Sequence, residues 1–154
     1  MTQIQVGDRA PQFTATAHSG QQVALADYLG KQVVVLYFYP RDGTPVCTAQ
    51  ACRFRDAYAD FVAAGAVVIG VSVNSLESHQ RFAEERRLPF LLVSDQDRAL
   101  QKAFGVPSLL GFLPGRTTYV IDKEGVVRHV FTSHFSADRH IDEALRVVRE
   151  LGGQ

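Results

Sequence analysis

The sequence predicts an α/β fold in which helices cover a sheet. Two apolar, β-branched runs of strand length, Val33–Phe38 and Ala66–Val73, are separated by a helical pattern of apolar residues. Their near-continuous apolar character is typical of strands that are buried on both faces. The 154 residues are 46% apolar, which is enough for a proper core. Since no repeat, linker or low-complexity tract interrupts the chain, we expect one domain over residues 1–154.

The N-terminal part predicts a small β-hairpin that precedes the central strand. Gln12–Thr16 and Gln22–Leu25 have the composition of short strands and lie on either side of Ser19 and Gly20. Ala26–Gly30 then predicts a short turn, from which the chain enters the buried strand.

A helix is predicted directly after the central strand, from about Pro45 to Ala64. Thr44 is a favourable N-cap, and Pro45 suits the first helical position because the N–H that it lacks would be unpaired there. Gly65 ends the helix. This register places Cys47 at the third helical position, where backbone N–H groups are still unpaired and the helix dipole is positive.

The second half of the chain predicts further helices between short strands. After the strand Ala66–Val73, Asn74 with Glu77 three residues later predicts a capping box for a helix that runs to Arg86. Pro89 prevents its continuation. The remaining predicted elements are a strand at Phe90–Ser94, a short helix at Arg98–Phe104, a loop at Ser108–Gly115, a hairpin of Thr117–Ile121 and Val126–Phe131, and a last helix capped by Ser136.

Composition and charge argue against several classes of partner. The chain has 16 basic and 16 acidic residues and no basic run, which argues against nucleic acid or an anionic membrane as the main partner. No apolar run approaches the length of a membrane span. The opening residues Met1–Val6 lack the pattern of a signal peptide, so a reducing cytosol is the predicted setting. Two close cysteines in that setting favour redox catalysis over a structural disulfide.

Cys47 has two interpretations. Free cysteines are often buried and contribute packing alone. This cysteine, however, follows a loop rich in glycine and proline and lies in the first turn of a helix, where a thiolate is stabilised. The thiolate is the reactive form of cysteine, so we favour a nucleophile.

The residues around Cys47 resemble the active-site motif of the peroxiredoxins. The spacing of the two cysteines resembles the peroxiredoxin Q, or bacterioferritin comigratory protein, branch, and the likeness covers nearly the whole chain. The matching segments are Pro40-x-x-x-Thr44-x-x-Cys47, Cys47-x4-Cys52, Leu113–Asp122 with its arginine Arg116, and the opening Val6–Phe13. One departure is Gln50, where many relatives carry glutamate.

The resemblance implies a thioredoxin-like fold with a mixed central sheet, and it implies roles for three residues beside Cys47. It implies that the Arg116 guanidinium faces the thiolate and the peroxide, although an arbitrary arginine at a strand start would be solvated. It implies that the Thr44 hydroxyl holds the peroxide, whereas the sequence by itself favours an N-cap. It implies that Pro40 shields the thiolate from water, whereas the sequence allows a simple end to the strand.

Cys52 is a packing residue or a resolving thiol. At five residues from Cys47 on one helix it lies about 7.5 Å further along the axis and about 140° around it. A disulfide usually requires Cα atoms within about 7 Å of each other. The intact helix therefore cannot close a Cys47–Cys52 bridge, and a resolving role requires the first helical turns to unwind.

The predicted function is a thiol-dependent peroxidase for hydrogen peroxide and organic hydroperoxides. Cys47 would become a sulfenic acid and condense with Cys52, and the resemblance implies a monomer whose disulfide is reduced by a thioredoxin-like protein. No cofactor is required, and the five histidines show no spacing typical of a metal site. Two alternatives remain: a general thiol–disulfide oxidoreductase, which predicts Cys-x-x-Cys instead, and a non-enzymatic binding or chaperone module, which does not need Cys47.

Overall fold

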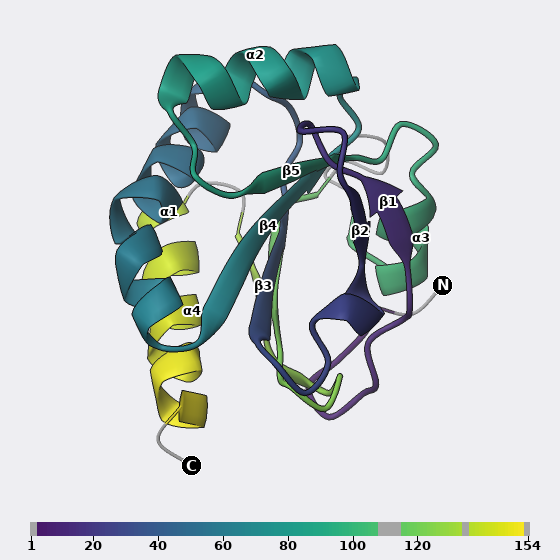
Figure 1. Ribbon diagram of the computed structural model, residues 1–154, viewed down its shortest axis with the longest axis vertical. Coiled ribbons are helices and arrows are strands. Elements are labelled where there is room, and N and C mark those ends of the chain that lie inside the picture. Colours follow the sequence, from purple (N-terminus) through teal and green to yellow (C-terminus); the bar gives the residue numbers. More distant parts are fainter. Residues whose placement is uncertain (1–2, 108–114, 134–135, 153–154) are drawn as a thin grey trace.

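The computed structural model confirms an α/β fold and describes residues 3–107, 115–133 and 136–152. A sheet of five strands in the order β5-β4-β3-β6-β7 forms the centre, and a separate two-stranded hairpin, β1-β2, precedes it (Figure 1). The elements are β1 Thr14–Thr16, β2 Gln22–Ala24, the 3-10 helix η1 Leu25–Asp27, β3 Val33–Phe38, α1 Pro45–Ala63, β4 Ala66–Ser72, α2 Leu76–Arg86, β5 Leu91–Ser94, α3 Ala99–Phe104, β6 Thr117–Ile121, β7 Val127–Thr132 and α4 Ala137–Gly152.

The sheet is mixed, and β3 lies at the change of direction. β3 pairs parallel with β4 on one side and antiparallel with β6 on the other. Phe38 at the end of β3 is opposite Thr117 at the start of β6. This register brings Arg116, one residue earlier, to the end of the sheet at which β3 leads toward α1.

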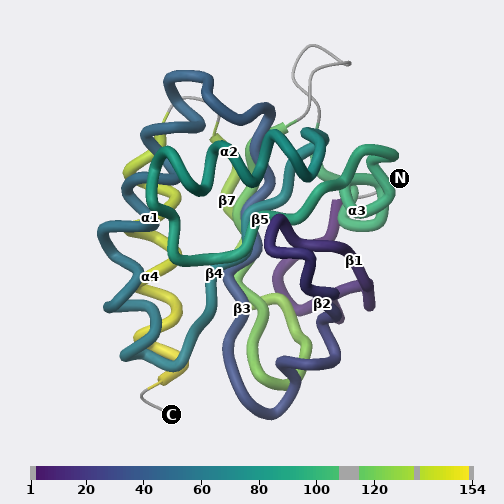
Figure 2. The backbone as a smooth tube through the Cα atoms, turned by 45° about the horizontal axis from the view of Figure 1, so that its top comes forward, coloured from purple at the N-terminus to yellow at the C-terminus, as the bar shows by residue number. Residues whose placement is uncertain are grey.

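Two cores lie on opposite faces of the sheet. Successive residues of β3 alternate between them: Val33, Val35 and Tyr37 join the core under α1 and α4, whereas Val34, Leu36 and Phe38 join the core under the hairpin and α3. Figures 1 and 2 show α1 and α4 side by side on one face and β1, β2 and α3 on the other. Burying one such side chain contributes roughly 1.5–3 kcal/mol, which explains why β3 is apolar throughout.

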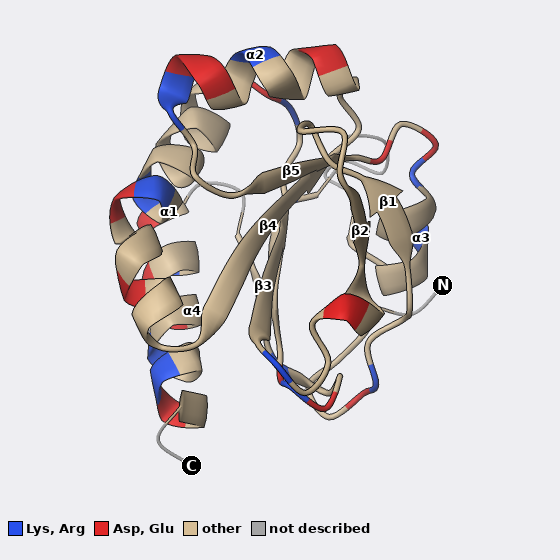
Figure 3. Cartoon of the chain, viewed as in Figure 1, with Lys and Arg blue, Asp and Glu red and all other residues tan. Residues whose placement is uncertain are grey.

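Charged side chains belong to the outer elements. In Figure 3 most Lys, Arg, Asp and Glu positions fall on helices and turns, and β3, β4 and β5 carry none; Arg128 of β7 is a charged strand residue. Within the described part of the chain, no helix is long and apolar enough to cross a membrane.

The predicted helix start at Asn74 is wrong by one residue. Ser75 is the N-cap of α2, and its hydroxyl accepts a hydrogen bond from the Ser78 amide at 3.2 Å. The Asn74 side chain accepts instead from the Asp42 amide at 2.9 Å and from the Ser72 hydroxyl at 2.7 Å. Local sequence allows either residue as the cap, and the contact of Asn74 with Asp42, which is distant in sequence, decides between them.

The other predicted elements are confirmed to within a few residues, including the N-terminal hairpin, the helix after β3 and the β6–β7 hairpin. The loop predicted at Ser108–Gly115 lies outside the described residues except for Gly115.

Candidate active site

The connection from β3 to α1 positions Cys47 as the sequence predicts. Pro45 is the first residue of α1, so Cys47 is the third. The first helical hydrogen bond runs from the Thr48 amide to the Thr44 carbonyl at 2.8 Å, and the amides of Val46 and Cys47 precede it. A thiolate at this point faces the positive end of the helix dipole. Cys47 is 1% exposed, so water screens this interaction little.

Arg116 provides the second positive group beside the thiol. Its Nη2 donates to Cys47 Sγ at 3.1 Å, and its Nη1 donates to Gln50 Oε1 at 2.6 Å. Arg116 is 3% exposed. Arginine keeps its proton in proteins, and its donors have a fixed geometry, so the guanidinium can stabilise negative charge on sulfur or on an adjacent oxygen.

Gln50 is fully buried and orients the arginine. Its Oε1 accepts from Arg116, while its Nε2 has no hydrogen-bond partner among the described residues. The amide is neutral, so it accepts from the guanidinium without adding a negative charge beside Cys47. The same guanidinium reaches the Cys47 sulfur through its other terminal nitrogen.

Thr44 lies at the N-cap position, but its hydroxyl does not cap the helix. The hydroxyl donates to the Arg41 carbonyl at 3.0 Å, and no side-chain cap bond is formed. The predicted capping role of the side chain is therefore wrong, because the hydroxyl donates to a carbonyl of the preceding loop and accepts from no amide of the helix. Its oxygen lone pairs can still accept a hydrogen bond from a substrate. Pro40 is half-buried between β3 and this loop.

Aromatic side chains from β3 and α1 form the wall behind the thiol. The Tyr37 ring stacks on Phe54 at 4.5 Å and on Tyr39 at 5.3 Å between centroids. Burial, and then the nearby Cys47, raises the pKa of Tyr37 well above its usual value. Burial, and then Tyr37 and Asp42, does the same for the pKa of Tyr39. Both phenols are therefore neutral at physiological pH and add no negative charge beside Cys47.

Cys52 lies further along α1 and is half-buried, and neither cysteine is bonded. The neighbouring Arg53 donates through Nε to Asp138 of α4 at 2.8 Å. The helix is continuous from Pro45 to Ala63, which agrees with the geometric argument that an intact α1 keeps the two thiols apart. The structure therefore brings Cys47 and Arg116 together, places Thr44 at the N-cap of the same helix, and leaves Cys52 unbonded to Cys47.

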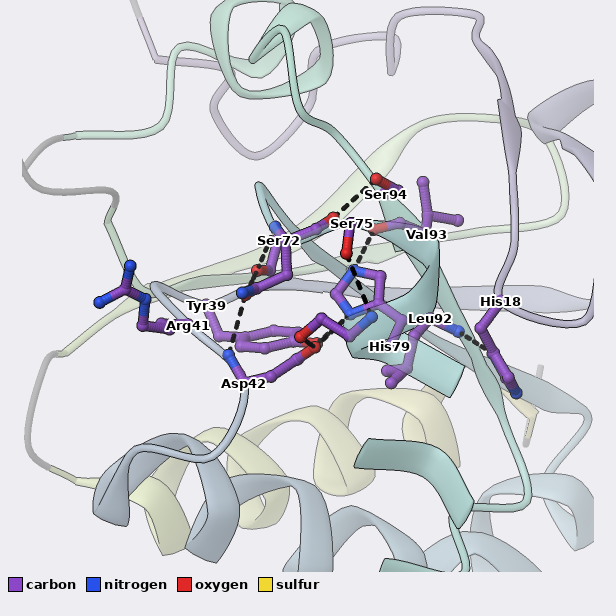
Figure 4. Close-up of polar contacts among 12 residues, drawn as sticks. His18, Tyr39, Arg41, Asp42, Ser72, Ser75, His79, Leu92, Val93 and Ser94 are labelled. Carbon is purple, nitrogen blue, oxygen red and sulfur yellow. Dashed lines mark hydrogen bonds and ion pairs between the residues drawn. The ribbon is translucent and has the colours of Figure 1, made fainter. Parts of the chain in front are cut away.

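Two residues of the same region, Asp42 and His79, were not predicted from the sequence to take part in the site. Asp42 is part of the loop before α1, and His79 is a fully buried residue of α2 whose ring contacts the Asp42 carboxylate (Figure 4). A signal did exist: His79 lies three residues before Phe82 on the apolar face of α2. A buried histidine requires polar partners, and no local pattern indicates which residues these are.

Most of this chain is similar to known proteins of one family. The profile of the AhpC/TSA family matches residues 6–130. Peroxiredoxin Q, chloroplastic, from Sedum lineare is 51% identical over 146 residues, which are 94% of this chain and 78% of that protein. The corresponding protein of Triticum aestivum is 48% identical over 96% of this chain and 68% of its own length.

Solved structures agree with these relatives. The crystal structure of peroxidoxin BcpB from Mycobacterium tuberculosis has a TM-score of 0.89 at 38% identity, and it covers 96% of this chain and 98% of that one. A structure of peroxiredoxin Q from Xanthomonas campestris has a TM-score of 0.83 at 30% identity, with 91% of each chain covered. This chain therefore belongs to the AhpC/TSA family and, within it, to the peroxiredoxins of the Q type.

Proposed function

We propose that Cys47 is the nucleophile of this thiol-dependent peroxidase. One observation supports this assignment above the others: the Cys47 sulfur lies in the first turn of α1 and 3.1 Å from the Arg116 guanidinium. Helix dipole and guanidinium both favour the thiolate, which is the form that attacks peroxide.

In the first step the Cys47 thiolate attacks one oxygen of the peroxide. A sulfur–oxygen bond forms, the O–O bond breaks, and the second oxygen leaves as hydroxide or alkoxide that takes up a proton to give water or an alcohol. Negative charge develops on the leaving oxygen, and Arg116 is the donor that can stabilise it. The Thr44 hydroxyl, whose hydrogen is directed to the Arg41 carbonyl, can accept a hydrogen bond from the peroxide.

In the second step Cys52 resolves the sulfenic acid. The Cys52 sulfur attacks the Cys47 sulfur, a disulfide forms and water leaves. Helix α1 must unwind locally before the two sulfurs can meet. We further propose that a thioredoxin-like dithiol reduces this disulfide and that the enzyme acts as a monomer. The cytosolic setting stays a prediction, since the plant relatives above are named chloroplastic.

The test is a single-turnover oxidation. Reduced protein is mixed with one equivalent of hydrogen peroxide in a stopped-flow instrument, and free thiols are counted over time. We expect rapid loss of both thiols in wild type and loss of one in Cys52→Ser. Peptide mapping of the oxidised wild type should find a Cys47–Cys52 bridge within one chain. Unchanged thiols after mixing, or peroxide consumption that survives in Cys47→Ser, would refute the assignment of Cys47.

A further inference from the structure

A buried polar cluster lies beside the proposed nucleophile and takes no part in the steps above. We call it the Asp42 cluster; it consists of Tyr39, Asp42, Asn74, Ser78 and His79. The Asp42 carboxylate accepts from the Tyr39 hydroxyl at 2.5 Å, from the Ser78 hydroxyl at 2.8 Å and from His79 Nδ1 at 2.7 Å. Its side chain is 5% exposed, and the His79 side chain is fully buried.

The partners of His79 show that its ring donates from both nitrogens. Nδ1 faces the Asp42 carboxylate, and Nε2 lies 3.0 Å from the Val93 carbonyl. A carboxylate and a carbonyl can accept only, so each ring nitrogen carries a hydrogen in this arrangement. His79 and Asp42 therefore form a buried imidazolium–carboxylate pair (Figure 4).

A second histidine, His18, comes from the turn between β1 and β2 and is close enough to His79 to be affected by its charge. His18 Nδ1 accepts from the Leu92 amide at 3.1 Å, so this ring is neutral. Burial, and then the charge of His79, lowers the pKa of His18. The Asp42 cluster thus contains one cation, His79, and one anion, Asp42, and the neighbouring His18 is neutral.

Asp42 also fixes the loop through its backbone. The Asp42 amide donates to Asn74 Oδ1 at 2.9 Å, and Asn74 is itself held by Ser72 and by Ser94, whose hydroxyl donates to the Asn74 carbonyl at 2.6 Å. Gly43 follows with a φ of 80°, a conformation that favours glycine. The backbone of Asp42 is therefore bound to the turn between β4 and α2 and its carboxylate to α2 itself, and this residue lies midway between Pro40 and Thr44.

We propose that Asp42 and His79 are positioning residues for peroxide reduction: their buried ion pair fixes the loop of residues 40–44 against α2 and thereby orients Thr44 toward Cys47. A buried ion pair is weak evidence for a gain in stability, because desolvation of two charges offsets their attraction. A role in orientation agrees better with the contacts, because the pair holds one short loop and that loop carries Pro40 and Thr44. This inference rests on the proposed role of Cys47.

The test compares two reactions of the same thiol. In Asp42→Asn and His79→Gln, the second-order rate of oxidation by hydrogen peroxide is measured by stopped flow, and alkylation by iodoacetamide is measured in parallel. Alkylation needs the thiolate but not a positioned peroxide. We expect the peroxide rate to fall by about ten- to a hundredfold, as for a misplacement of about 1 Å, while alkylation changes by less than about threefold. The double variant should lose no more than the worse single variant.

His129→Gln is the matched control. His129 is a half-buried histidine that faces a carboxylate, Glu143, at 4.0 Å, and it lies on β7 away from the thiol. We expect both rates to stay at the wild-type level. Tyr39→Phe removes one donor to Asp42 and leaves the ion pair, so its loss of peroxide rate should be smaller than that of either charge variant.

The outcomes separate this inference from the proposed function. If wild-type Cys47 does not react with peroxide, the proposed function is wrong. If it reacts and both charge variants keep the wild-type ratio of peroxide rate to alkylation rate, the positioning role alone is overturned. Near-ultraviolet circular dichroism identifies a variant that fails to fold, and Tyr39→Phe, which keeps both charges, then decides: an unchanged ratio in that variant overturns the role as well.

Discussion

The two cysteine-bearing turns of α1 are held in place by different kinds of contact. Around Cys47 the contacts are buried: Cys47, Gln50 and Arg116 are at most 3% exposed and form a continuous set of hydrogen bonds. Around Cys52 the polar contacts are exposed: Arg53 reaches Asp138 and Asp142 on α4, and these three side chains are 42%, 71% and 68% exposed.

The difference indicates which contacts change during the reaction. A buried charge-assisted hydrogen bond contributes about 1.5–3 kcal/mol, whereas an exposed ion pair contributes about 0–1 kcal/mol. The strong contact depends on the charge of the Cys47 sulfur, and oxidation to a sulfenic acid removes that charge. The first turn is thus held firmly before the reaction and loosely after it, while the polar contacts beside Cys52 are weak throughout.

The largest effect is expected from Cys47→Ser, which removes the sulfur that the first turn is built to hold. Serine has nearly the same size, so we expect an intact fold, normal far-ultraviolet circular dichroism and no measurable peroxide turnover. Steady-state peroxide consumption with a dithiol reductant measures this. Turnover that remained near the wild-type level would show that the buried contacts of the first turn serve packing alone.

Cys52→Ser is expected to stop turnover after one equivalent of peroxide, because no local thiol can resolve the sulfenic acid. Mass spectrometry should detect a gain of oxygen on Cys47 and further oxidation with excess peroxide. In wild type, oxidation should remove exchange protection from amides between Val46 and Arg55, and reduction should restore it. A helix that stays fully protected when oxidised would exclude Cys52 as the local resolving thiol.

Arg116→Lys is expected to slow peroxide reduction although it keeps the charge. Lysine lacks the planar fork that reaches Gln50 and Cys47 together, and the loss of one charge-assisted bond lowers the rate by roughly ten- to a hundredfold. Stopped-flow oxidation across pH measures this. Arg128→Lys, at an exposed arginine of the same hairpin, is the control that should keep the wild-type rate.

Gln50→Glu is expected to have a moderate effect. A carboxylate at this position would pair with Arg116 and compete with the thiolate for its charge. Alkylation of Cys47 at neutral pH should slow several-fold, less than the loss expected for Arg116→Lys. Faster alkylation in Gln50→Glu would contradict the view that a carboxylate here competes with the thiolate for Arg116.

The smallest effect is expected from Asp138→Asn, which removes one exposed partner of Arg53. The disulfide-forming step should accelerate by no more than about fivefold, and the free energy of unfolding should fall by about 0.2–1 kcal/mol. Glu150→Gln breaks an equally exposed bridge to Arg146 within α4, and it should change stability alone. Equal effects of both variants on disulfide formation would show that the Arg53 contacts do not restrain the Cys52 turn.

Sequence patterns predicted the fold and the position of Cys47 because both depend on local information. The position of Cys47 in α1 follows from the apolar run of β3, from Pro45 at the start of the helix and from Gly65 after its end. Asp42 and His79 could not be paired in advance, since 37 residues separate them and their contact depends on how α2 crosses the end of the sheet. The same limit explains the misplaced cap at Asn74, whose side chain binds Asp42 instead of α2.

The antiparallel pairing of β3 with β6 also has a consequence for biosynthesis. It joins residues 34–38 to residues 117–121, so Arg116 reaches Cys47 once a long segment of chain has closed. Contacts between such distant segments form slowly, because closing the loop costs entropy before the strands can pair. A nascent chain that ends before β6 carries Cys47 without its guanidinium partner. The activated thiol is therefore a property of the finished domain, and its reactivity can serve as a probe of complete folding.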